Sequence, residues 1–192
     1  MIKVYLIRHG EAIDGWTSLD PVLSKRGRKQ AEELKLILKD KLTDKIDIIS
    51  SPLSRCQETA SISVKESKKE ITIDDVFREL PSPVESLDRR VIWLKRVLPL
   101  DWEDLEQDIE SKLSNINYHL WREKIISKIL SFKSDTIIFT HFVVINNVIG
   151  KIMKSTKVVN FYPENCSITE IGVENNKIEL IKLGNSSVTK VN

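Results

Sequence analysis

The stretch IKVYLIRHG, residues 2–10, determines the fold class that we expect for this chain. Apart from Lys3, its first six residues are apolar or aromatic and rich in branched side chains, a composition typical of a buried strand. The apolar run stops at Arg8, His9 and Gly10. In open α/β sheets, ligand sites lie beyond the carboxyl ends of the strands. The polar residues that end this strand are therefore candidate site residues.

Two further apolar runs end in polar groups in the same way. Residues 46–50 (IDIIS) predict a second strand, which is followed by Ser51 and then Arg55. Residues 135–140 (DTIIFT) predict a third strand, which stops at His141. Because parallel strands bring their carboxyl ends to one edge of a sheet, the three ends are expected to bring two arginines and two histidines together.

Helical patterns separate these strands. Helices are expected over 24–39, from Ser51 onward, and over 142–153. Ser24 is the expected N-cap of the first helix, and Ser51 with Pro52 at the first helical position is expected to begin the second. Strands that alternate with helices predict an α/β fold with a mostly parallel central sheet.

The remaining segments carry weaker patterns. Residues 71–74 predict a short strand, and the alternating runs 167–173 and 177–183 predict a hairpin. Residues 84–132 predict a long helical region that 115–117 interrupts or kinks. One face of this helical region is expected to carry Trp102, Leu105, Ile109, Leu113, Ile116 and Leu120.

Length and composition restrict the class of protein. A chain of 192 residues with 41% hydrophobic and 30% charged residues is expected to form one domain, residues 1–192. The formal net charge of +2 provides no general attraction to nucleic acid or to an anionic membrane. No apolar stretch approaches the length of a membrane span or of a signal-peptide core. The two cysteines, Cys56 and Cys166, are far apart in the sequence, and one disulfide is possible but not demanded, so we expect a cytoplasmic protein. It is expected to be a monomer or a homodimer.

The expected cluster of arginines and histidines suits phosphoryl transfer. Arg offers a planar fork of donors that matches phosphoryl oxygens, and helix N-termini add free N–H groups. A neutral imidazole such as that of His9 can act as a nucleophile and carry the phosphoryl group. Gly10 allows the backbone to approach a ligand closely. Each of these residues alone has an ordinary structural explanation, but their joint placement at three strand ends favours function.

At these residues the sequence resembles the histidine phosphatase superfamily, the phosphoglycerate mutase-like family. The resemblance rests on segments in the family's order across almost the whole chain: VYLIRHGEA at 4–12, LSKRGRKQA at 23–31, SSPLSRCQETA at 50–60, FREL at 77–80, IIFTHF at 137–142 and NCSITEI at 165–171. It implies a single phosphoglycerate mutase-like domain. The expected fold class is thus α/β, a three-layer α/β/α sandwich with a mostly parallel central sheet and a helical cap insertion at 84–132.

The resemblance also implies a role for each site residue. His9 would be the phosphorylated nucleophile, and Arg8 and Arg55 would clamp the phosphoryl group. His141 would contact the same group and stabilise the transition state. Glu79 would be the general acid and then the base, with Glu85 and Glu58 as alternative acids. Phe142 would offer its backbone N–H to the substrate.

The sequence departs from the family pattern at three places. A Trp-Asn pair usually follows the RHG segment closely, whereas here Trp16-Thr17 stand later. Phe142 replaces the glycine of the usual His-Gly motif, which reduces the space beside the phosphate. Pro81-Ser82-Pro83 stands where a Gly-x-Trp-Glu-Gly stretch is common. These departures bear on the identity of the substrate more than on the chemistry of His9.

The expected cap contains an acidic segment. Its carboxylates are Asp101, Glu103, Asp104, Glu106, Asp108 and Glu110. Facing the pocket, they would repel bisphosphates, but a solvated helix face is the interpretation that we favour. Trp93, Trp102 and Trp121 are expected to be core residues more than pocket residues.

The favoured function is a phosphomonoesterase that releases inorganic phosphate from a small phosphorylated metabolite through a phosphohistidine at His9. The first alternative is a cofactor-dependent phosphoglycerate mutase, which would require priming by 2,3-bisphosphoglycerate. The second is a non-catalytic member that binds phosphorylated ligands. His9, His119 and His141 lack the short spacings of zinc ligands, so neither a metal nor a cofactor is expected.

Overall fold

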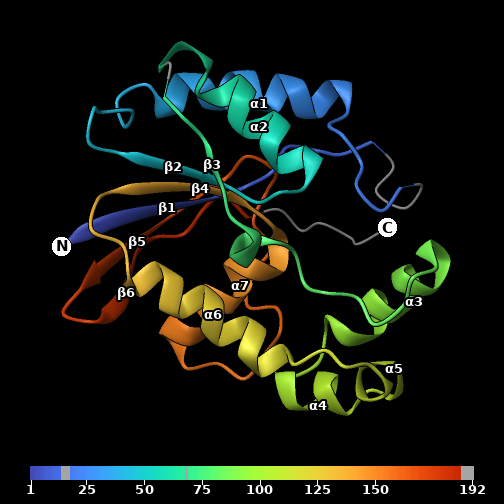
Figure 1. Ribbon diagram of the computed structural model, residues 1–192. Coiled ribbons are helices and arrows are strands. Elements are labelled where there is room, and N and C mark those ends of the chain that lie inside the picture. The colour runs from blue at the N-terminus through green and yellow to red at the C-terminus, as the bar shows by residue number, and fades with distance from the viewer. Residues whose placement is uncertain (14–17, 68, 187–192) are drawn as a thin grey trace.

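A computed structural model describes residues 1–13, 18–67 and 69–186. A six-stranded sheet in the order β3-β2-β4-β1-β5-β6 runs through the centre of the molecule (Figure 1). The strands are β1 (Ile2–Arg8), β2 (Asp47–Ser50), β3 (Thr72–Ile73), β4 (Thr136–Thr140), β5 (Ile168–Glu174) and β6 (Lys177–Lys182).

Four neighbouring strands of the sheet are parallel. β1 pairs with β4, β4 with β2, and β2 with β3 in parallel register, whereas β5 and β6 form an antiparallel hairpin that joins the sheet along β1. Arg8 lies opposite Thr140, and Ser50 lies opposite Phe139. The expected mostly parallel sheet and the C-terminal hairpin are therefore confirmed, and three strands end side by side.

Helices cover both faces of the sheet, as the three-layer prediction requires. α1 (Lys25–Leu38) and α2 (Ser54–Ser63) lie on one face, and α6 (Tyr118–Leu130) and α7 (Phe142–Met153) lie on the other (Figure 1). Each face has its own apolar core. Leu34, Leu38, Ile48, Ala60 and Phe139 belong to the first core, and Leu6, Ile125, Ile138, Val144 and Val148 belong to the second.

Helix α1 forms for the reasons that its sequence suggests. The Ser24 side chain accepts a hydrogen bond from the backbone N–H of Gly27, which satisfies one of the free donors of the first turn. Ala31, Leu34 and Leu38 are buried at helical spacing against the sheet. Helix α7 begins and ends at the residues predicted from the sequence.

The predicted start of the second helix is wrong. α2 begins at Ser54 with Leu53 at its N-cap position. The side chain of Ser51 is hydrogen-bonded to Nε2 of His141 at 2.7 Å, so it does not cap the helix. Asp20 caps α2 instead, because its carboxylate accepts from the Ser54 backbone N–H at 2.8 Å and from the Ser54 hydroxyl at 2.7 Å.

The region between Ser86 and Ser131 holds four separate helices, α3 (Leu87–Val97), α4 (Trp102–Gln107), α5 (Ile109–Leu113) and α6. The predicted continuous apolar face is wrong at Ile109 and Leu113, which are 70% and 82% exposed, whereas Ile116 packs partly buried against the same core as Leu105. Asp108 ends α4 and begins α5, where its side chain accepts from the backbone N–H groups of Glu110 and Ser111. Because Asp108 caps α5 with its side chain, it stands outside both helices, and α4 ends there.

Helices α3 to α5 lie beside the sheet rather than on it (Figure 1). They enclose a third apolar core, which includes Trp93, Val97, Trp102, Leu105 and Tyr118. Trp93 and Trp102 are buried as predicted, and Trp121 is partly buried between this core and the second one.

Short elements complete the described chain. Two 3-10 turns, η1 (Lys65–Ser67) and η2 (Asp75–Phe77), flank β3, which lies within the predicted segment 71–74.

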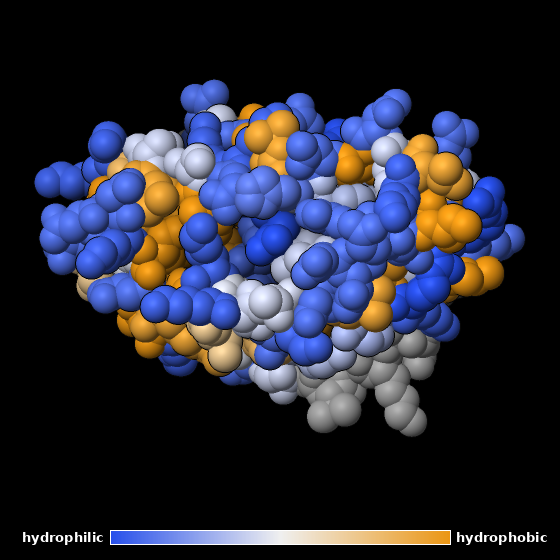
Figure 2. Space-filling model, turned by 90° about the horizontal axis from the view of Figure 1, so that it is seen from below, coloured by the Kyte–Doolittle hydropathy of each residue, from blue (hydrophilic) through white to orange (hydrophobic). Residues whose placement is uncertain are grey.

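No helix in the described part of the chain is long and apolar enough to cross a membrane. The face seen from below is mostly hydrophilic, with hydrophobic side chains grouped toward its two ends (Figure 2).

Candidate functional site

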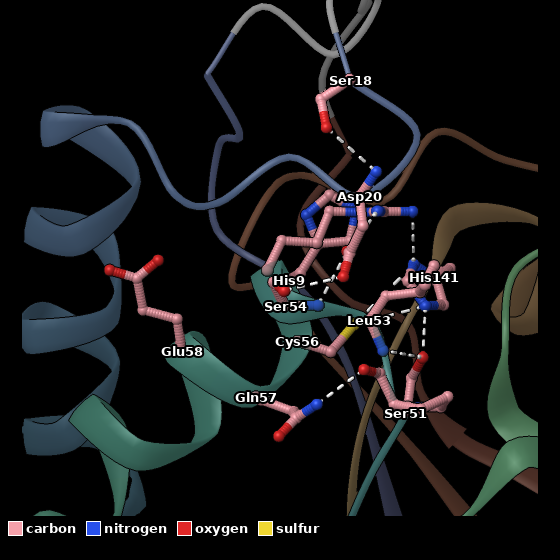
Figure 3. Close-up of polar contacts among 12 residues, drawn as sticks. His9, Ser18, Asp20, Ser51, Leu53, Ser54, Cys56, Gln57, Glu58 and His141 are labelled. Atoms are coloured by element: carbon pink, nitrogen blue, oxygen red, sulfur yellow. Dashed lines mark hydrogen bonds and ion pairs between the residues drawn. The ribbon is translucent and has the colours of Figure 1, made fainter.

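The ends of β1, β2 and β4 bring His9 and His141 together. Backbone pairing continues one residue beyond the strands, because His9 N–H donates to the Thr140 carbonyl at 3.0 Å and Ser51 N–H donates to the Phe139 carbonyl at 2.9 Å. The two imidazole rings consequently lie edge to face, with centroids 5.3 Å apart (Figure 3). The convergence of strand ends predicted from the sequence is present.

The hydrogen bonds of His9 define its tautomer. Nδ1 lies 2.7 Å from the Gly10 carbonyl oxygen, which can only accept, so Nδ1 carries the proton. Nε2 is then the unprotonated nitrogen, and it accepts a hydrogen bond from Nε of Arg55 at 3.1 Å. Burial lowers the pKa of His9 well below its ordinary value, and the positive charges of Arg55 and Arg8 lower it further. His9 is thus a neutral imidazole with a lone pair directed at the arginine.

Arg55 connects the two histidines. Its Nη2 donates to Nδ1 of His141 at 3.2 Å, which leaves the Nε2 proton of His141 for the Ser51 hydroxyl. Burial, followed by the charge of Arg55, lowers the pKa of His141 well below its ordinary value. Asp20 lies 3.8 Å from Arg55 and is the nearest charge that balances it. Both ring nitrogens of His141 are therefore occupied by protein groups.

Arg8 approaches the site from the other side. Its Nη1 donates to the Pro163 carbonyl at 2.8 Å, and its guanidinium carbon lies 5.3 Å from the centre of the Phe142 ring. Its Nε is buried and has no hydrogen-bond partner in the described part of the structure. Burial lowers the pKa of Arg8, whereas the charge of Glu79 raises it. Part of the Arg8 donor fork thus remains free for an anion.

Three backbone contacts hold the loop that carries His9. Gly10 N–H donates to the Thr59 hydroxyl at 3.0 Å, and the side-chain amide of Asn165 donates to the His9 carbonyl at 2.9 Å. A Cβ atom at Gly10 would lie only 2.7 Å from the carbonyl oxygen of Gly27. The loop therefore packs directly against the first turn of α1, and glycine is required at this contact.

Glu79 caps the helix that begins after His141. Its Oε1 accepts from the backbone N–H groups of Leu80 at 2.9 Å and of Val143 at 3.2 Å. Burial raises the pKa of Glu79, although the Leu80 N–H and the charge of Arg55 oppose the shift. A carboxyl group with a raised pKa retains its proton more readily, which suits a general acid.

The two alternative acids lie in other environments. Glu58 points away from His9 toward α1, where its oxygens accept from Nε of Arg28 at 2.5 Å and from the Leu23 N–H at 2.8 Å (Figure 3). Glu85 is exposed and lines a separate cavity near Arg89. Of the three glutamates, Glu79 is therefore the one best placed beside Arg55.

A cavity of about 270 Å³ opens over these groups. Of the site residues predicted from the sequence, Arg8, His9 and Arg55 line this cavity, whereas His141, Glu79 and Phe142 are absent from its wall. The full lining is Arg8, His9, Glu11, Ala12, Ser18, Leu19, Pro21, Arg55, Arg90, Leu94 and Asn165.

Several residues that line the cavity or contact its arginines escaped the sequence analysis. Arg90 and Leu94 come from α3 and had no motif to indicate them, and Asp20 lies in a segment with no regular pattern. Asn165 lies in the segment NCSITEI, which supported the family resemblance but gave it no individual role. The predicted departure at Trp16-Thr17 falls outside the described residues.

The acidic segment of the cap region does not line the cavity. Asp108 and Glu110 form ion pairs with Arg96, and Glu110 also pairs with Arg89. Asp101 pairs with Lys157. The described residues also include no group of three or more His, Cys, Asp or Glu that could hold a metal ion.

The fold and the site define a class of α/β protein with two arginines and two histidines at the carboxyl edge of a parallel sheet. In a comparison with family models, residues 4–92 match the model of the histidine phosphatase superfamily (branch 1). The resemblance to this family that the sequence motifs indicated is thereby confirmed.

Solved structures support the same fold. A phosphoserine phosphatase from Entamoeba histolytica, in complex with 3-phosphoglyceric acid, is 22% identical over 98% of both chains, with a TM-score of 0.71. A phosphoglycerate mutase from Bacillus anthracis is 20% identical over 95% of this chain and 92% of that chain, with a TM-score of 0.70. The Bacillus stearothermophilus protein YhfR is 18% identical over 97% and 98%, with a TM-score of 0.73. No curated protein matches the sequence.

Proposed function

We propose that the protein is a phosphomonoesterase that works through a phosphohistidine intermediate at His9 and releases inorganic phosphate from a small phosphorylated substrate. The observation that carries this proposal is the state of His9. Its Nδ1 proton is held by the Gly10 carbonyl, so the Nε2 lone pair faces Arg55 at the wall of the cavity. A buried neutral imidazole fixed in this way is an activated nucleophile.

In the first step, Nε2 of His9 attacks phosphorus, an N–P bond forms, and the bond to the ester oxygen breaks. The leaving oxygen takes a proton from the carboxyl group of Glu79. Nδ1 keeps its proton, and the positive charge that develops on the ring is stabilised by the Gly10 carbonyl. This role requires Glu79 to leave its contact with Val143 N–H and turn toward the cavity.

In the second step, water attacks the phosphorus of phospho-His9 while Glu79 accepts a proton from it. The N–P bond breaks, its electron pair returns to Nε2, and inorganic phosphate leaves. Arg8 and Arg55 contribute the positive charge that stabilises the transferring group in both steps. Arg55 must exchange its hydrogen bond to Nε2 for bonds to the phosphoryl oxygens.

His141 supports this chemistry mainly through Arg55. With Arg55 at one ring nitrogen and Ser51 at the other, the ring orients the arginine. A direct contact between His141 and the phosphoryl group, which the family resemblance implies, requires Arg55 to move aside. Phe142 contributes the aromatic ring beside Arg8, and its backbone N–H, in the first turn of α7, has no acceptor among the described residues.

The test compares the wild type with His9→Ala and the matched control His119→Ala, since His119 is the third histidine and is exposed. We expect hydrolysis of p-nitrophenyl phosphate in the presence of a chelator by the wild type and the control. His9→Ala is expected to lose at least about 10³-fold in kcat. Full activity in His9→Ala would refute the proposal.

Two further readouts separate the competing functions. Rapid quenching with labelled substrate is expected to trap an acid-labile, alkali-stable phosphohistidine in the wild type and not in His9→Ala. Activity that appears only after addition of 2,3-bisphosphoglycerate, together with 3-phosphoglycerate as acceptor, would instead support a mutase. Binding of phosphate without turnover of any phosphomonoester would support a non-catalytic protein.

A further inference from the structure

The guanidinium of Arg8 has an aromatic ring as one of its partners. Its central carbon lies over the Phe142 ring, 5.3 Å from the ring centre, which is within the range of a cation–π interaction. Its Nη1 donates to the Pro163 carbonyl at 2.8 Å. Within the described residues Arg8 is therefore held by a carbonyl and a ring, with no carboxylate at hydrogen-bond distance.

The kind of partner matters, because the same guanidinium is expected to bind an anion. A carboxylate would occupy the donor fork of Arg8 and neutralise its charge. An aromatic ring attracts a cation through its quadrupole and offers no lone pair to the N–H donors. The buried Nε of Arg8, which has no partner in the described part of the structure, is one of the donors left over. The Phe142 ring thus restrains Arg8 without competing with a phosphoryl group.

The Phe142 ring is itself held in place by its surroundings. Phe142 is the first residue of α7, and its side chain packs partly buried against the third apolar core. The ring of Tyr162 packs against it, with centroids 5.7 Å apart. A ring fixed by a core and by a second ring offers Arg8 a rigid support.

A fully buried side chain, that of Asn146, ties Phe142 to the segment 160–163. Its amide nitrogen donates to the Phe142 carbonyl at 3.0 Å. Its amide oxygen accepts from the backbone N–H groups of Asn160 at 2.7 Å and of Phe161 at 3.0 Å. One amide therefore connects the two elements that hold the guanidinium, the start of α7 and the segment whose carbonyl receives Nη1.

We infer that Phe142 is a positioning residue whose ring holds Arg8 in its anion-binding orientation, so that the affinity of the site for a phosphoryl group depends on the electron density of that ring. The inference rests on the proposed function, in which Arg8 clamps the phosphoryl group. Arg8 and Arg55 repel each other when no anion lies between them, and a restraint on Arg8 opposes this repulsion. Because Phe142 stands where the family motif has a glycine, the contact is a feature of this chain and not of the motif.

The test changes the electron density of the ring while keeping its shape. Phe142 is replaced in the full chain by 4-fluorophenylalanine and by pentafluorophenylalanine, and the dissociation constant of inorganic phosphate is measured by calorimetry. Fluorine withdraws electron density from the ring face, which weakens its attraction for a cation. We expect the dissociation constant to rise at each step, by about 3- to 30-fold for pentafluorophenylalanine, the range that corresponds to a cation–π contact.

A matched control and two ordinary substitutions complete the series. Pentafluorophenylalanine in place of Phe132, whose ring packs against Phe77, is expected to leave the dissociation constant unchanged. Phe142→Tyr keeps an aromatic face and is expected to keep the affinity within about twofold. Phe142→Leu keeps apolar bulk without a π face and is expected to lose about as much affinity as the pentafluorinated protein. A role in packing alone predicts no dependence on fluorination.

Three results would overturn the inference: an affinity that is the same across the fluorinated series, wild-type affinity in Phe142→Leu, or no binding of phosphate by the wild type at millimolar concentration. Tighter binding by the fluorinated proteins would overturn it as well, since an electron-poor ring attracts an anion directly. A thermal unfolding curve shows whether each variant is folded, and the fluorinated proteins provide the milder change if Phe142→Leu is not.

The proposed function fails separately from this inference. An affinity for phosphate that follows the fluorination of Phe142, in a protein that neither hydrolyses p-nitrophenyl phosphate nor forms a phosphohistidine, would support the role of the ring and refute the phosphatase. Where hydrolysis is present, kcat/KM for p-nitrophenyl phosphate is expected to fall along the fluorinated series in parallel with the affinity for phosphate.

Discussion

The protonation states of His9 and Glu79 control the proposed reaction at the level of single residues. The nucleophile must be neutral, and burial together with Arg55 and Arg8 lowers the pKa of His9 well below its ordinary value. The acid must keep its proton, and burial raises the pKa of Glu79. The two shifts move in opposite directions, which widens the pH range in which both groups are in the required form.

This pair of shifts predicts an acidic pH optimum. As pH rises, activity should appear when His9 loses its proton at a pH well below 6.5, and decline when Glu79 loses its proton at a pH above its ordinary value. A profile of kcat/KM against pH with p-nitrophenyl phosphate measures both limbs. In Glu79→Gln the alkaline decline should flatten, because the side chain no longer titrates.

The comparison with Glu79→Gln separates the titration of a group in the enzyme from the titration of the substrate. The phosphate ester also titrates in this pH range, but its contribution is the same for the wild type and the variant. Glu58→Gln serves as the matched control, since that carboxylate is held by Arg28 and Leu23 away from the site. An alkaline limb that persists unchanged in Glu79→Gln would assign the acid to another group.

At the residue level, sequence patterns predicted the groups that end strands and not those that arrive from loops or neighbouring helices. Arg8, His9 and His141 follow apolar runs directly, so their meeting at one sheet edge was predictable. Asp20 and Arg90 reach the site through tertiary packing of an irregular segment and of α3, and no local pattern marks such a position. Ser51 was predicted as a helix cap because its competing partner, His141, is 90 residues away.

At the scale of elements, the contact between the His9 loop and α1 is the tightest constraint on the site. A Cβ at Gly27 would lie 2.0 Å from the carbonyl oxygen of Glu11, which is backbone and cannot rotate away. Ser24 strengthens the same contact, since its hydroxyl donates to Glu11 and accepts from Gly27 N–H. The position of α1 therefore determines the position of the loop.

Gly27→Ala tests this coupling. In an ordinary helix the change would stabilise the protein by up to about 1 kcal/mol, but overpacking against backbone costs about 1–3 kcal/mol. We expect a lower free energy of unfolding in urea and at least a tenfold loss of phosphatase activity, since small displacements of reacting groups are costly. Lys29→Ala, an exposed change on the same helix, should alter neither quantity appreciably. A Gly27→Ala protein as stable and active as the wild type would contradict the role of this contact.

The elements themselves were predictable where their patterns were long and regular. Helix α7 and the hairpin of β5 and β6 lie where the sequence placed them. The region 84–132 was not resolved into its four helices, because Asp108 fits a helical face by spacing but acts as a cap in the structure. Apolar residues at a spacing of three or four fit one long helix as well as two consecutive short helices. The spacing alone therefore does not show where one helix ends and the next begins.

For the whole molecule, the distribution of charge matters more than its sum. The formal net charge is only +2, yet among the described residues three arginines and a single acidic residue line one cavity. Asp20, 3.8 Å from Arg55, opposes part of this charge, whereas Asp108 and Glu110 are paired with Arg96 and Arg89 outside the cavity. An anion is therefore attracted to this cavity and not to the surface in general.

Binding of inorganic phosphate should consequently stabilise the folded protein as a whole. A ligand present at 100 times its dissociation constant adds about 2.7 kcal/mol to the free energy of unfolding, which corresponds to a rise in Tm of roughly 5–10 °C for a chain of this size. Thermal unfolding measured over a series of phosphate concentrations should show this rise in the wild type. Sulfate at equal ionic strength should give a smaller rise, and sodium chloride should give none.

The same titration on two arginine variants locates the effect. Arg55→Met removes a buried guanidinium that contacts both histidines, so the phosphate-dependent rise in Tm should be lost even if the variant starts from a different Tm. Arg89→Met removes a cation of equal charge outside the cavity and should keep the full rise. Equal stabilisation of both variants would mean that phosphate binds to the general surface. If only Arg55→Met loses the phosphate-dependent rise in Tm, phosphate binds in the cavity. The positive potential that attracts it then comes from the arginines at the three strand ends and not from the net charge.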